Sequence, residues 1–199
     1  MDLVPTDSEQ RALALADVAY EAAACTRCDL ALTRNLVVFG EGDPGARIML
    51  IGEAPGRHED ETGRPFAGAA GVVLDSVLEA AGMDRSEVFI TAAVKCRPPK
   101  NRDPKPEEMA ACRHWLSAQL AMVRPDVIIG LGTYGTRALL GRTGPISKIR
   151  GEVHDVDGIV VVPTFHPAAV IYDPKKRDVL VSDLIAIREL AESRARERS

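Results

Sequence analysis

The residues of this 199-residue chain with the clearest capacity for chemistry are its cysteines, of which there are four. Cys25 and Cys28 form a C-x2-C pair, which places two thiolates at chelating distance, and Cys96 and Cys112 follow far along the chain. None lies in an apolar run, which favours metal ligation over burial as small apolar side chains. A zinc site usually pairs two C-x2-C units, whereas an iron–sulfur cluster needs four thiolates without that pairing. The spacing therefore predicts a metal site and leaves zinc and iron–sulfur both open.

A turn rich in carboxylates follows the apolar run at residues 48–51. The turn begins with residues 52–56, which are typical of a loop, and it contains Glu53. Glu59 and Asp60 follow within a few residues. Three carboxylates around one turn at a strand end are either a solvated loop or part of a site that moves protons.

An aromatic ring and an imidazole lie in two further segments. Phe66 stands among small residues in the segment 63–68, just before a predicted helix whose free N–H groups favour an anion. His166 comes after the apolar run that ends at residue 162, so we expect it at the rim of a sheet and not in the core. A histidine at a strand end that faces a carboxylate loop is a stronger candidate for chemistry than an isolated one.

The segment 130–135, Gly-Leu-Gly-Thr-Tyr-Gly, matches the G-x-G-x-x-G pattern of dinucleotide-binding proteins. Asp155 or Asp157 lies about as far along the chain as the ribose-binding acid of such proteins. This alternative predicts an oxidoreductase that binds a nicotinamide or flavin nucleotide. The competing interpretation is a tight turn in which small residues let a strand and a helix pack closely. We favour the tight turn, because the fingerprint usually opens the first βαβ unit and two predicted strands precede this one.

Predicted strands and helices alternate along the chain, which is typical of an α/β fold. Strands are predicted at 48–51, 88–91, 127–129 and 159–162, and helices at 7–24, 72–81, from 106, at 133–140 and from about 174. We expect a three-layer αβα sandwich with a central, mostly parallel four-stranded sheet, in a single domain over residues 1–199. The loops 52–56, 91–96 and 165–169 would meet at the carboxyl edge of the sheet, where such folds bind ligands. A metal would join the N-terminal helix to the 96–112 loop.

Composition and charge are those of a globular protein. Apolar residues make up 46% and charged residues 27%, and no apolar run approaches the length of a membrane span, so we expect no membrane contact. The start of the chain lacks an apolar leader and four cysteines suit a reducing compartment, so we expect a cytoplasmic protein, and we expect a monomer. The net charge of −4 gives no general attraction for nucleic acid, and contact with DNA would depend on basic segments such as 95–102.

Taken together, these segments resemble the family 4 (iron–sulfur) uracil-DNA glycosylases. The first motif of that family resembles residues 52–56, 59–60, 63–68 and 70–71. The second motif resembles His166-Pro167-Ala168-Ala169, and the central strand and cluster loop resemble residues 90–99. The resemblance covers about residues 20–190. It favours a [4Fe–4S] cluster over zinc, with four ligands: Cys25, Cys28, Cys96 and Cys112.

The resemblance implies an enzyme that flips a nucleotide out of DNA and hydrolyses its base–sugar bond. Glu53 would act on the attacking water beside the sugar. Glu59 and Asp60 would assist it, and the sequence does not show how the three carboxylates share this role. His166 would donate a hydrogen bond to the base oxygen that gains charge, and Phe66 would stack on the flipped base. No lysine in either loop is placed to form a Schiff base, so a monofunctional, hydrolytic reaction is predicted.

Further residues are implied to contact the base and the DNA. The base would also be contacted by Gly52, Ala54, Ala92 and Asp60. The duplex would be entered by Ala169 and Val170. The phosphates would be held by Arg97, Lys100 and Arg102.

The sequence departs from the family where the base is read. Family members usually carry Asn shortly after Ile-Thr, and its amide reads the uracil edge, whereas this chain has Ala92 followed by Ala93. The usual Val after Phe66 is Ala67. These alanines remove a polar reader and make room. The substrate is then either uracil or a bulkier modified cytosine of phage DNA, such as glucosylated hydroxymethylcytosine, which would imply antiphage defence. A non-catalytic iron–sulfur protein that binds DNA is a further alternative.

Overall fold

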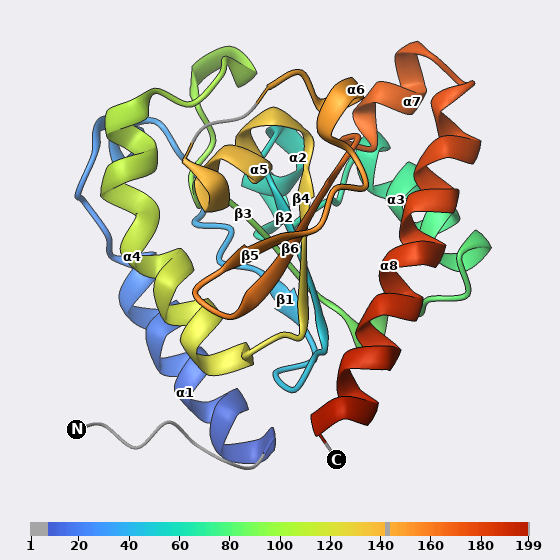
Figure 1. Cartoon of the computed structure of the whole chain (residues 1–199). Helices are drawn as coiled ribbons and strands as arrows, with labels where there is room; N and C mark the ends of the chain where they lie inside the picture. The colour runs from blue at the N-terminus through green and yellow to red at the C-terminus, as the bar shows by residue number, and fades with distance from the viewer. Residues whose placement is uncertain (1–7, 142–143, 199) are drawn as a thin grey trace.

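Helices flank a central sheet on both faces in the computed structural model, which describes residues 8–141 and 144–198 (Figure 1). The four parallel strands are β2 (Ile48–Gly52), β3 (Phe89–Ala92), β4 (Val127–Leu131) and β6 (Ile159–Thr164). They lie side by side in the order β3-β2-β4-β6. Each of the four predicted strands is present, and the predicted three-layer α/β class is confirmed.

Two short antiparallel strands extend the sheet, which therefore has six strands and not the four predicted. β1 (Glu41–Gly42) pairs with β3 at one edge, and β5 (His154–Val156) pairs with β6 at the other. Neither strand contains a run of buried apolar residues. Hydropathy could not reveal them, because an apolar run or alternation is the signal by which strands are predicted.

Two pairs of long helices cover the sheet. α1 (Ser8–Ala23) and α4 (Pro106–Val123) lie on one face, and α3 (Ala69–Ala80) and α8 (Lys176–Arg198) lie on the other (Figure 1). The shorter helices and 3₁₀ turns are α2 (Arg57–Thr62), α5 (Gly132–Leu140), α6 (Ile146–Ile149), α7 (Ala168–Tyr172), η1 (Asp29–Leu32), η2 (Arg85–Glu87) and η3 (Pro99–Asn101). All five predicted helices are present, although residue 7, the predicted start of the first, lies outside the described residues. Of the helices in the described ranges, none is long and apolar enough to cross a membrane.

The strands divide the core into two halves, because successive side chains of a strand point to opposite faces. In β2, Ile48 and Leu50 pack with α3 and α8, whereas Met49 and Ile51 pack with α1 and α4. The same alternation continues in β4 and β6. Burial on both faces explains why the parallel strands are continuous apolar runs in the sequence.

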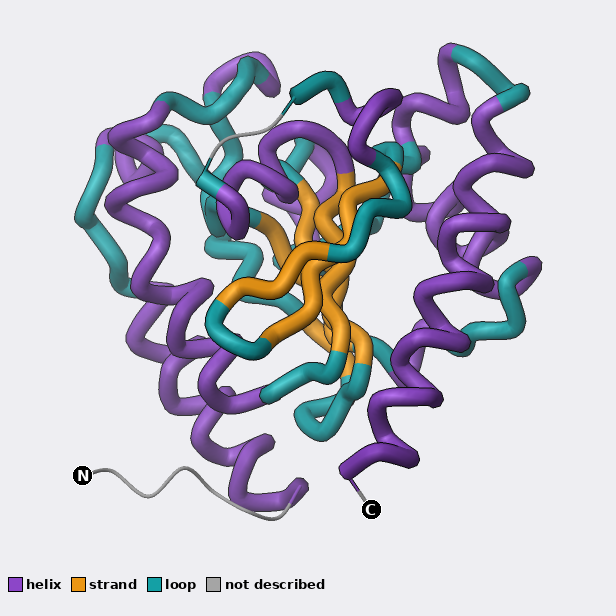
Figure 2. The backbone as a smooth tube through the Cα atoms, viewed as in Figure 1, coloured by secondary structure: helices purple, strands orange, loops and turns teal. Residues whose placement is uncertain are grey.

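The carboxyl ends of the four parallel strands lie at one end of the sheet. β2 leads into the carboxylate turn, β3 into the loop toward Cys96, β4 into the glycine turn 130–135, and β6 into His166. In Figure 2 these loops and short helices gather at the upper end of the sheet. The fold therefore brings together the segments that carry the candidate chemistry, as the parallel topology predicted.

Candidate active site

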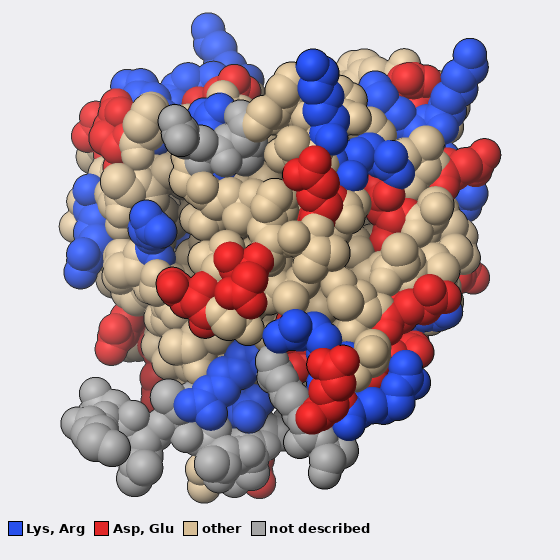
Figure 3. Space-filling model, in the orientation of Figure 1, with Lys and Arg blue, Asp and Glu red and all other residues tan. Residues whose placement is uncertain are grey.

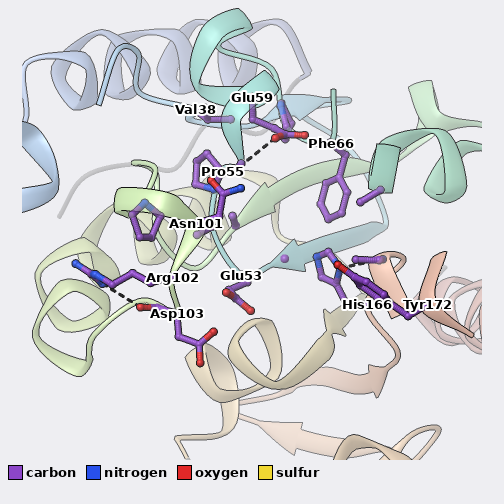
Figure 4. A pocket seen from close by; sticks show the side chains of 18 residues that line it. Val38, Glu53, Pro55, Glu59, Phe66, Asn101, Arg102, Asp103, His166 and Tyr172 are labelled. Atoms are coloured by element: carbon purple, nitrogen blue, oxygen red, sulfur yellow. Dashed lines mark hydrogen bonds between the residues drawn. The ribbon is translucent and has the colours of Figure 1, made fainter. Parts of the chain in front are cut away.

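A pocket of about 550 Å³ opens at this carboxyl edge (Figure 4). The predicted residues that line it are Gly52, Glu53, Ala54, Glu59, Phe66, Ala92 and His166. Residues that were not predicted for the base pocket also line it, among them Asn101, Asp103 and Tyr172. Three loops that are distant in sequence thus form one concave site.

The carboxylates of Glu59 and Asp60 are held by structural hydrogen bonds. Glu59 accepts from the backbone N–H groups of Gly56 (3.0 Å) and Gly68 (2.9 Å), so it ties the start of α2 to the start of α3. Asp60 is buried and accepts from the backbone N–H (2.9 Å) and the side-chain amide (2.7 Å) of Asn35. Asp60 is not among the residues that line the pocket, so its predicted contact with substrate is not supported.

Glu53 differs from these two, because no described residue is found to hydrogen-bond its carboxylate. Burial raises the pKa of Glu53 to about 7, and the negative charge of Asp103 adds to the rise. A general base works best when its pKa lies near the working pH. Glu53 is therefore the carboxylate of this turn that is free to accept a proton.

His166 presents an N–H group to the pocket. The backbone N–H of Ala168 donates to its Nδ1 (3.2 Å), and burial lowers the pKa of His166 to about 4. A neutral imidazole that accepts at Nδ1 carries its proton on Nε2, which is then a hydrogen-bond donor. Gly132, with a φ of +73°, makes this placement possible, since a Cβ there would lie 3.0 Å from the Cβ of His166.

Phe66 forms the adjoining wall. Its ring stacks on His166 with centroids 5.5 Å apart and an interplanar angle of 27°. Its φ of 51° is left-handed, which is uncommon for a residue other than glycine. Two glycines make room for it: a Cβ at Gly71 would lie 1.7 Å from the Phe66 carbonyl oxygen, and a Cβ at Gly52 would lie 2.9 Å from its ring.

The three alanines predicted to enlarge the base pocket lie in different places. Ala92 is buried at the end of β3 and lines the pocket. Ala93 is buried and Ala67 is exposed, and neither is among the lining residues. Of these three alanines, Ala92 is therefore the one that lines the pocket.

The residues predicted to enter the duplex require a correction. Val170 is only 8% exposed, because α7 turns it toward the core against α3 and α8. Ala169 is half-buried. The same helix instead exposes Ile171 (49%) and Tyr172 (88%), and Tyr172 lines the pocket.

The predicted phosphate contacts also differ from one another. Lys100 is exposed, and Arg97 bonds the side chain of Asn101 (2.7 Å) while remaining half-exposed. Arg102 forms an ion pair of 2.6 Å with the buried carboxylate of Glu108, so the positive charge of Arg102 is already paired within the protein. Arg102 is therefore a structural residue first.

Further lysine and arginine side chains gather along the upper edge of the face seen in Figure 3, over α6 and the turn between α7 and α8. Lys148 and Lys175 are the exposed lysines of these segments. This edge lies at the carboxyl end of the sheet, where the pocket opens, so exposed lysines are present there, with acidic side chains among them, in a chain whose net charge is −4.

The four cysteines gather at a second, much smaller pocket. Cys25 and Cys28 follow α1, Cys96 lies in the loop after β3, and Cys112 lies in α4. Within residues 8–141 and 144–198, no three Cys, His, Asp or Glu side chains converge closely enough to hold a single metal ion. Cysteines that each bind a different iron of a cluster need not converge in this way.

Hydrogen-bond donors surround the cysteine pocket. The backbone N–H of Lys95 donates to the Sγ of Cys112 (3.3 Å), and Arg34 donates to the Sγ of Cys96 (3.5 Å). The indole N–H of Trp115, which lines the same pocket, is buried with no partner among the described residues. Such donors stabilise anionic sulfur, so this set fits an iron–sulfur cluster.

The buried ammonium of Lys95 also fits an anionic group there. Lys95 is 1% exposed, and its Nζ donates three hydrogen bonds of 2.7 Å to the neutral acceptors Thr91 Oγ1, Ala92 O and Gln119 Oε1. Burial lowers the pKa of Lys95 to about 8, and ionised sulfur at Cys112 and Cys96 would act in the opposite direction. A buried cation requires a nearby anion, and a cluster bound by these cysteines would supply it.

The glycines of the turn 130–135 are explained by packing. A Cβ at Gly130 would lie 2.7 Å from the Oγ1 of Thr136, and a Cβ at Gly135 would lie 2.1 Å from the carbonyl oxygen of Ile51. This supports the tight-turn interpretation over the dinucleotide-binding alternative.

Comparison with known proteins identifies the class. Residues 39–186 match the family model of the uracil DNA glycosylase superfamily. Because this match covers most of the chain, the chain belongs to that superfamily. It is therefore a DNA glycosylase, a hydrolase of the bond between a base and its sugar.

Several individual relatives within this superfamily are Type-4 uracil-DNA glycosylases. The chain is 43% identical over 186 residues to the Type-4 uracil-DNA glycosylase of Sulfurisphaera tokodaii, covering 89% of this chain and 84% of the relative. It is 41% identical over 184 residues to the Type-4 enzyme of Archaeoglobus fulgidus, covering 88% and 92%. It is 48% identical over 149 residues to the Type-4 enzyme of Thermotoga maritima, covering 74% and 78%.

Proposed function

We propose that this chain removes uracil from DNA by hydrolysing its N-glycosyl bond and leaves an abasic site. The relatives described above are named as uracil-DNA glycosylases. The observation that carries the proposal is one pocket in which an unpaired carboxylate, Glu53, shares the walls with a neutral imidazole donor, His166, and an aromatic ring, Phe66.

In this mechanism Glu53 takes a proton from the attacking water. The water oxygen forms a bond to C1′ of the sugar as the C1′–N1 bond breaks, and the electrons of that bond leave with the base. The sugar carries positive charge in the transition state, which the carboxylate stabilises. Water is the nucleophile and no protein side chain bonds the sugar, so the reaction is hydrolytic and monofunctional.

His166 stabilises the departing base. The Nε2–H group donates a hydrogen bond to the base oxygen on which negative charge develops, and Phe66 stacks on the base plane. A neutral imidazole keeps its proton while donating, so the base leaves as an anion and takes its proton from solvent afterwards. Glu59 holds the loop that positions Glu53.

Contact with DNA is assigned to the rim of the pocket. Tyr172 and Ile171 are the exposed apolar side chains of α7, and we propose that they fill the space left in the duplex by the flipped base. Lys100, Lys148 and Lys175 are proposed to contact phosphates.

We also propose that Cys25, Cys28, Cys96 and Cys112 bind a [4Fe–4S] cluster. The cluster would supply a rigid anionic crosslink between α1, α4 and the loop after β3. This loop continues into Arg97 and η3, so the crosslink would brace a segment that borders the pocket, within one domain.

A second candidate substrate is a modified cytosine with a bulky group, such as glucosylated hydroxymethylcytosine of phage DNA, which would give the enzyme an antiphage role. The observation in its favour is Ala92, which lines the pocket and offers no side-chain hydrogen bond to read a uracil edge. A site without that reader discriminates less against other bases.

The test compares base release from a duplex with a single uracil and from glucosylated phage DNA, with Glu53→Gln as the inactive control. Release of uracil by the natural chain and not by Glu53→Gln supports the proposal. Release from phage DNA alone favours the second candidate. No release from either DNA by protein that carries its cluster would overturn both and leave a DNA-binding role. Ala92→Asn, which restores an amide at the end of β3, is expected to raise uracil release.

A further inference from the structure

Asp103 is a second acidic side chain at the mouth of the pocket. It follows η3, and it faces the pocket that Glu53 lines from the end of β2 (Figure 4). The hydroxyl of Tyr134 donates to the Oδ2 of Asp103 (2.7 Å), which fixes the carboxylate in place. Two carboxylates from different loops therefore share one pocket, and one of them is anchored.

Within residues 8–141 and 144–198, three basic side chains of the surrounding segments have other partners. The guanidinium of Arg137, on α5, lies over the ring of Tyr134, 5.1 Å from its centroid. The guanidinium of Arg102, the residue before Asp103, is paired with Glu108 at 2.6 Å. Lys95, in the segment after β3, is fully buried and directs its ammonium to Thr91, Ala92 and Gln119.

The other groups that line the pocket leave the charges of Glu53 and Asp103 in place. His166, after β6, is neutral above pH about 4. Glu59, on α2, is bonded to backbone N–H groups. The hydrogen bond to Asp103 raises the pKa of Tyr134, on α5, so its hydroxyl is uncharged near neutral pH. Among the described groups that line the pocket, the charge that remains opposite Glu53 is that of Asp103.

We propose that Asp103, anchored by Tyr134, is a positioning residue whose negative charge keeps Glu53 basic enough to take the proton from the attacking water. This inference rests on the proposed role of Glu53. A like charge favours the protonated form of a carboxyl, and a stronger base takes a proton more readily in the transition state. The direction agrees with the raised pKa of Glu53, to which burial contributes most and Asp103 next.

DNA would strengthen the coupling. In the free protein Asp103 is exposed on one side, so water screens its charge. DNA that covers the mouth of the pocket excludes this water, and the interaction between two charges grows as the local dielectric constant falls. The effect of Asp103 is therefore larger in the enzyme–DNA complex than in the free enzyme.

The proposal also gives the glycine turn a function. Gly130, Gly132 and Gly135 allow the close approach of α5 to β2 and to His166, and Tyr134 lies in the first turn of that helix. The turn that resembles a nucleotide-binding fingerprint thus positions Tyr134, whose hydroxyl bonds Asp103.

The test uses the full chain with its cluster and has two readouts. The first is the pKa of the Glu53 carboxyl, followed by carbon-13 NMR in the absence of DNA. The second is the single-turnover rate of uracil release from pH 5 to 9 at saturating enzyme, which removes differences in DNA affinity. The variants are Asp103→Asn and Tyr134→Phe, and the matched control is Glu107→Gln, which removes one exposed negative charge four residues away.

Asp103→Asn is expected to shift the acid limb of the rate profile to lower pH by about half a unit or more, and the pKa of Glu53 in the same direction. The plateau rate is expected to fall about twofold, since the base is weaker. Tyr134→Phe is expected to give a smaller shift of the same sign, and Glu107→Gln none.

An unchanged acid limb in Asp103→Asn, or an equal shift in Glu107→Gln, would overturn the proposal. If Asp103→Asn fails to fold, an unshifted Tyr134→Phe profile overturns it. If the natural chain releases no base, the proposed function fails, and the NMR titration still decides whether Asp103 sets the basicity of Glu53.

Discussion

The ring of Phe66 and the imidazole of His166, which are 100 positions apart in sequence, stack with their centroids 5.5 Å apart. One comes from the loop before α3 and the other from the loop after β6. Their contact therefore packs together the ring proposed to stack on the base and the imidazole proposed to donate a hydrogen bond to it.

Removing the carboxylate of Glu53 should abolish the chemistry without harming the fold. In Glu53→Gln we expect the single-turnover rate to fall by about 10²-fold or more, the size of a general-base contribution. The thermal midpoint should stay the same or rise, because Glu53 accepts no hydrogen bond from the described residues and is partly desolvated. Asp60→Asn should instead lower the thermal midpoint, since the carboxylate of Asp60 accepts hydrogen bonds from Asn35. Full activity in Glu53→Gln would contradict the assignment.

The pH dependence should show one limb between pH 5 and 9. Glu53 must be ionised to accept a proton, so the rate should rise with pH and level off above its pKa of about 7. His166 adds no limb in this range, because its pKa is held near 4 and it is neutral throughout. His166→Asn should lower the rate about 10²–10³-fold while keeping the position of the limb. A descending limb from pH 5 upward would show that a protonated histidine is needed instead.

Gly71 should be intolerant of a side chain. In Gly71→Ala the new Cβ would lie 1.7 Å from the carbonyl oxygen of Phe66, so α3 or the Phe66 loop must move. We expect a loss of about 1–3 kcal/mol in the free energy of unfolding, measured by urea titration, together with a lower rate of base release. Gly45→Ala is the control, since its Cβ would come no closer than 3.4 Å to other atoms. Equal stability of the two variants would contradict the close approach.

Lys95 should be needed for the cluster. In Lys95→Met the buried positive charge is lost, and we expect iron bound per chain to fall and the absorbance near 400 nm to fall with it. Trp115 is the one tryptophan of the chain and lines the cysteine pocket, so a bound cluster should quench its fluorescence by energy transfer. Loss of iron should therefore restore the emission. Lys105→Met, at an exposed position, should leave both signals unchanged. A full iron content in Lys95→Met would contradict the charge argument.

The sequence alone predicts the parallel core of the fold well, because buried strands are written as continuous apolar runs. Residues 48–51, 127–129 and 159–162 are such runs, and each forms a strand. β1 and β5 were missed because their stability comes from pairing with β3 and β6 and not from their own composition.

The sequence places Glu53, Phe66 and His166 in one candidate site, and these three residues line one pocket in the structure. The sequence does not separate the roles of the carboxylates. Glu53, Glu59 and Asp60 are alike in sequence, and only their hydrogen-bond partners separate them. The exposure of Tyr172 and burial of Val170 follow from the orientation of α7, which a five-residue helix does not reveal by periodicity. Asp103 and Tyr134 are 31 positions apart, and no local pattern joins them.

The two edge strands have a consequence for how the protein behaves at high concentration. A parallel sheet with long open edges is a template for pairing with other chains and for aggregation. Here the apolar strands are enclosed by β1, which has two residues, and β5, which has three, so each edge offers few unpaired backbone groups. At Gly42, moreover, a Cβ would lie 1.9 Å from the carbonyl oxygen of Val88, so the glycine allows β1 to lie close against β3. The short edge strands thereby limit the pairing of this sheet with the sheets of other molecules.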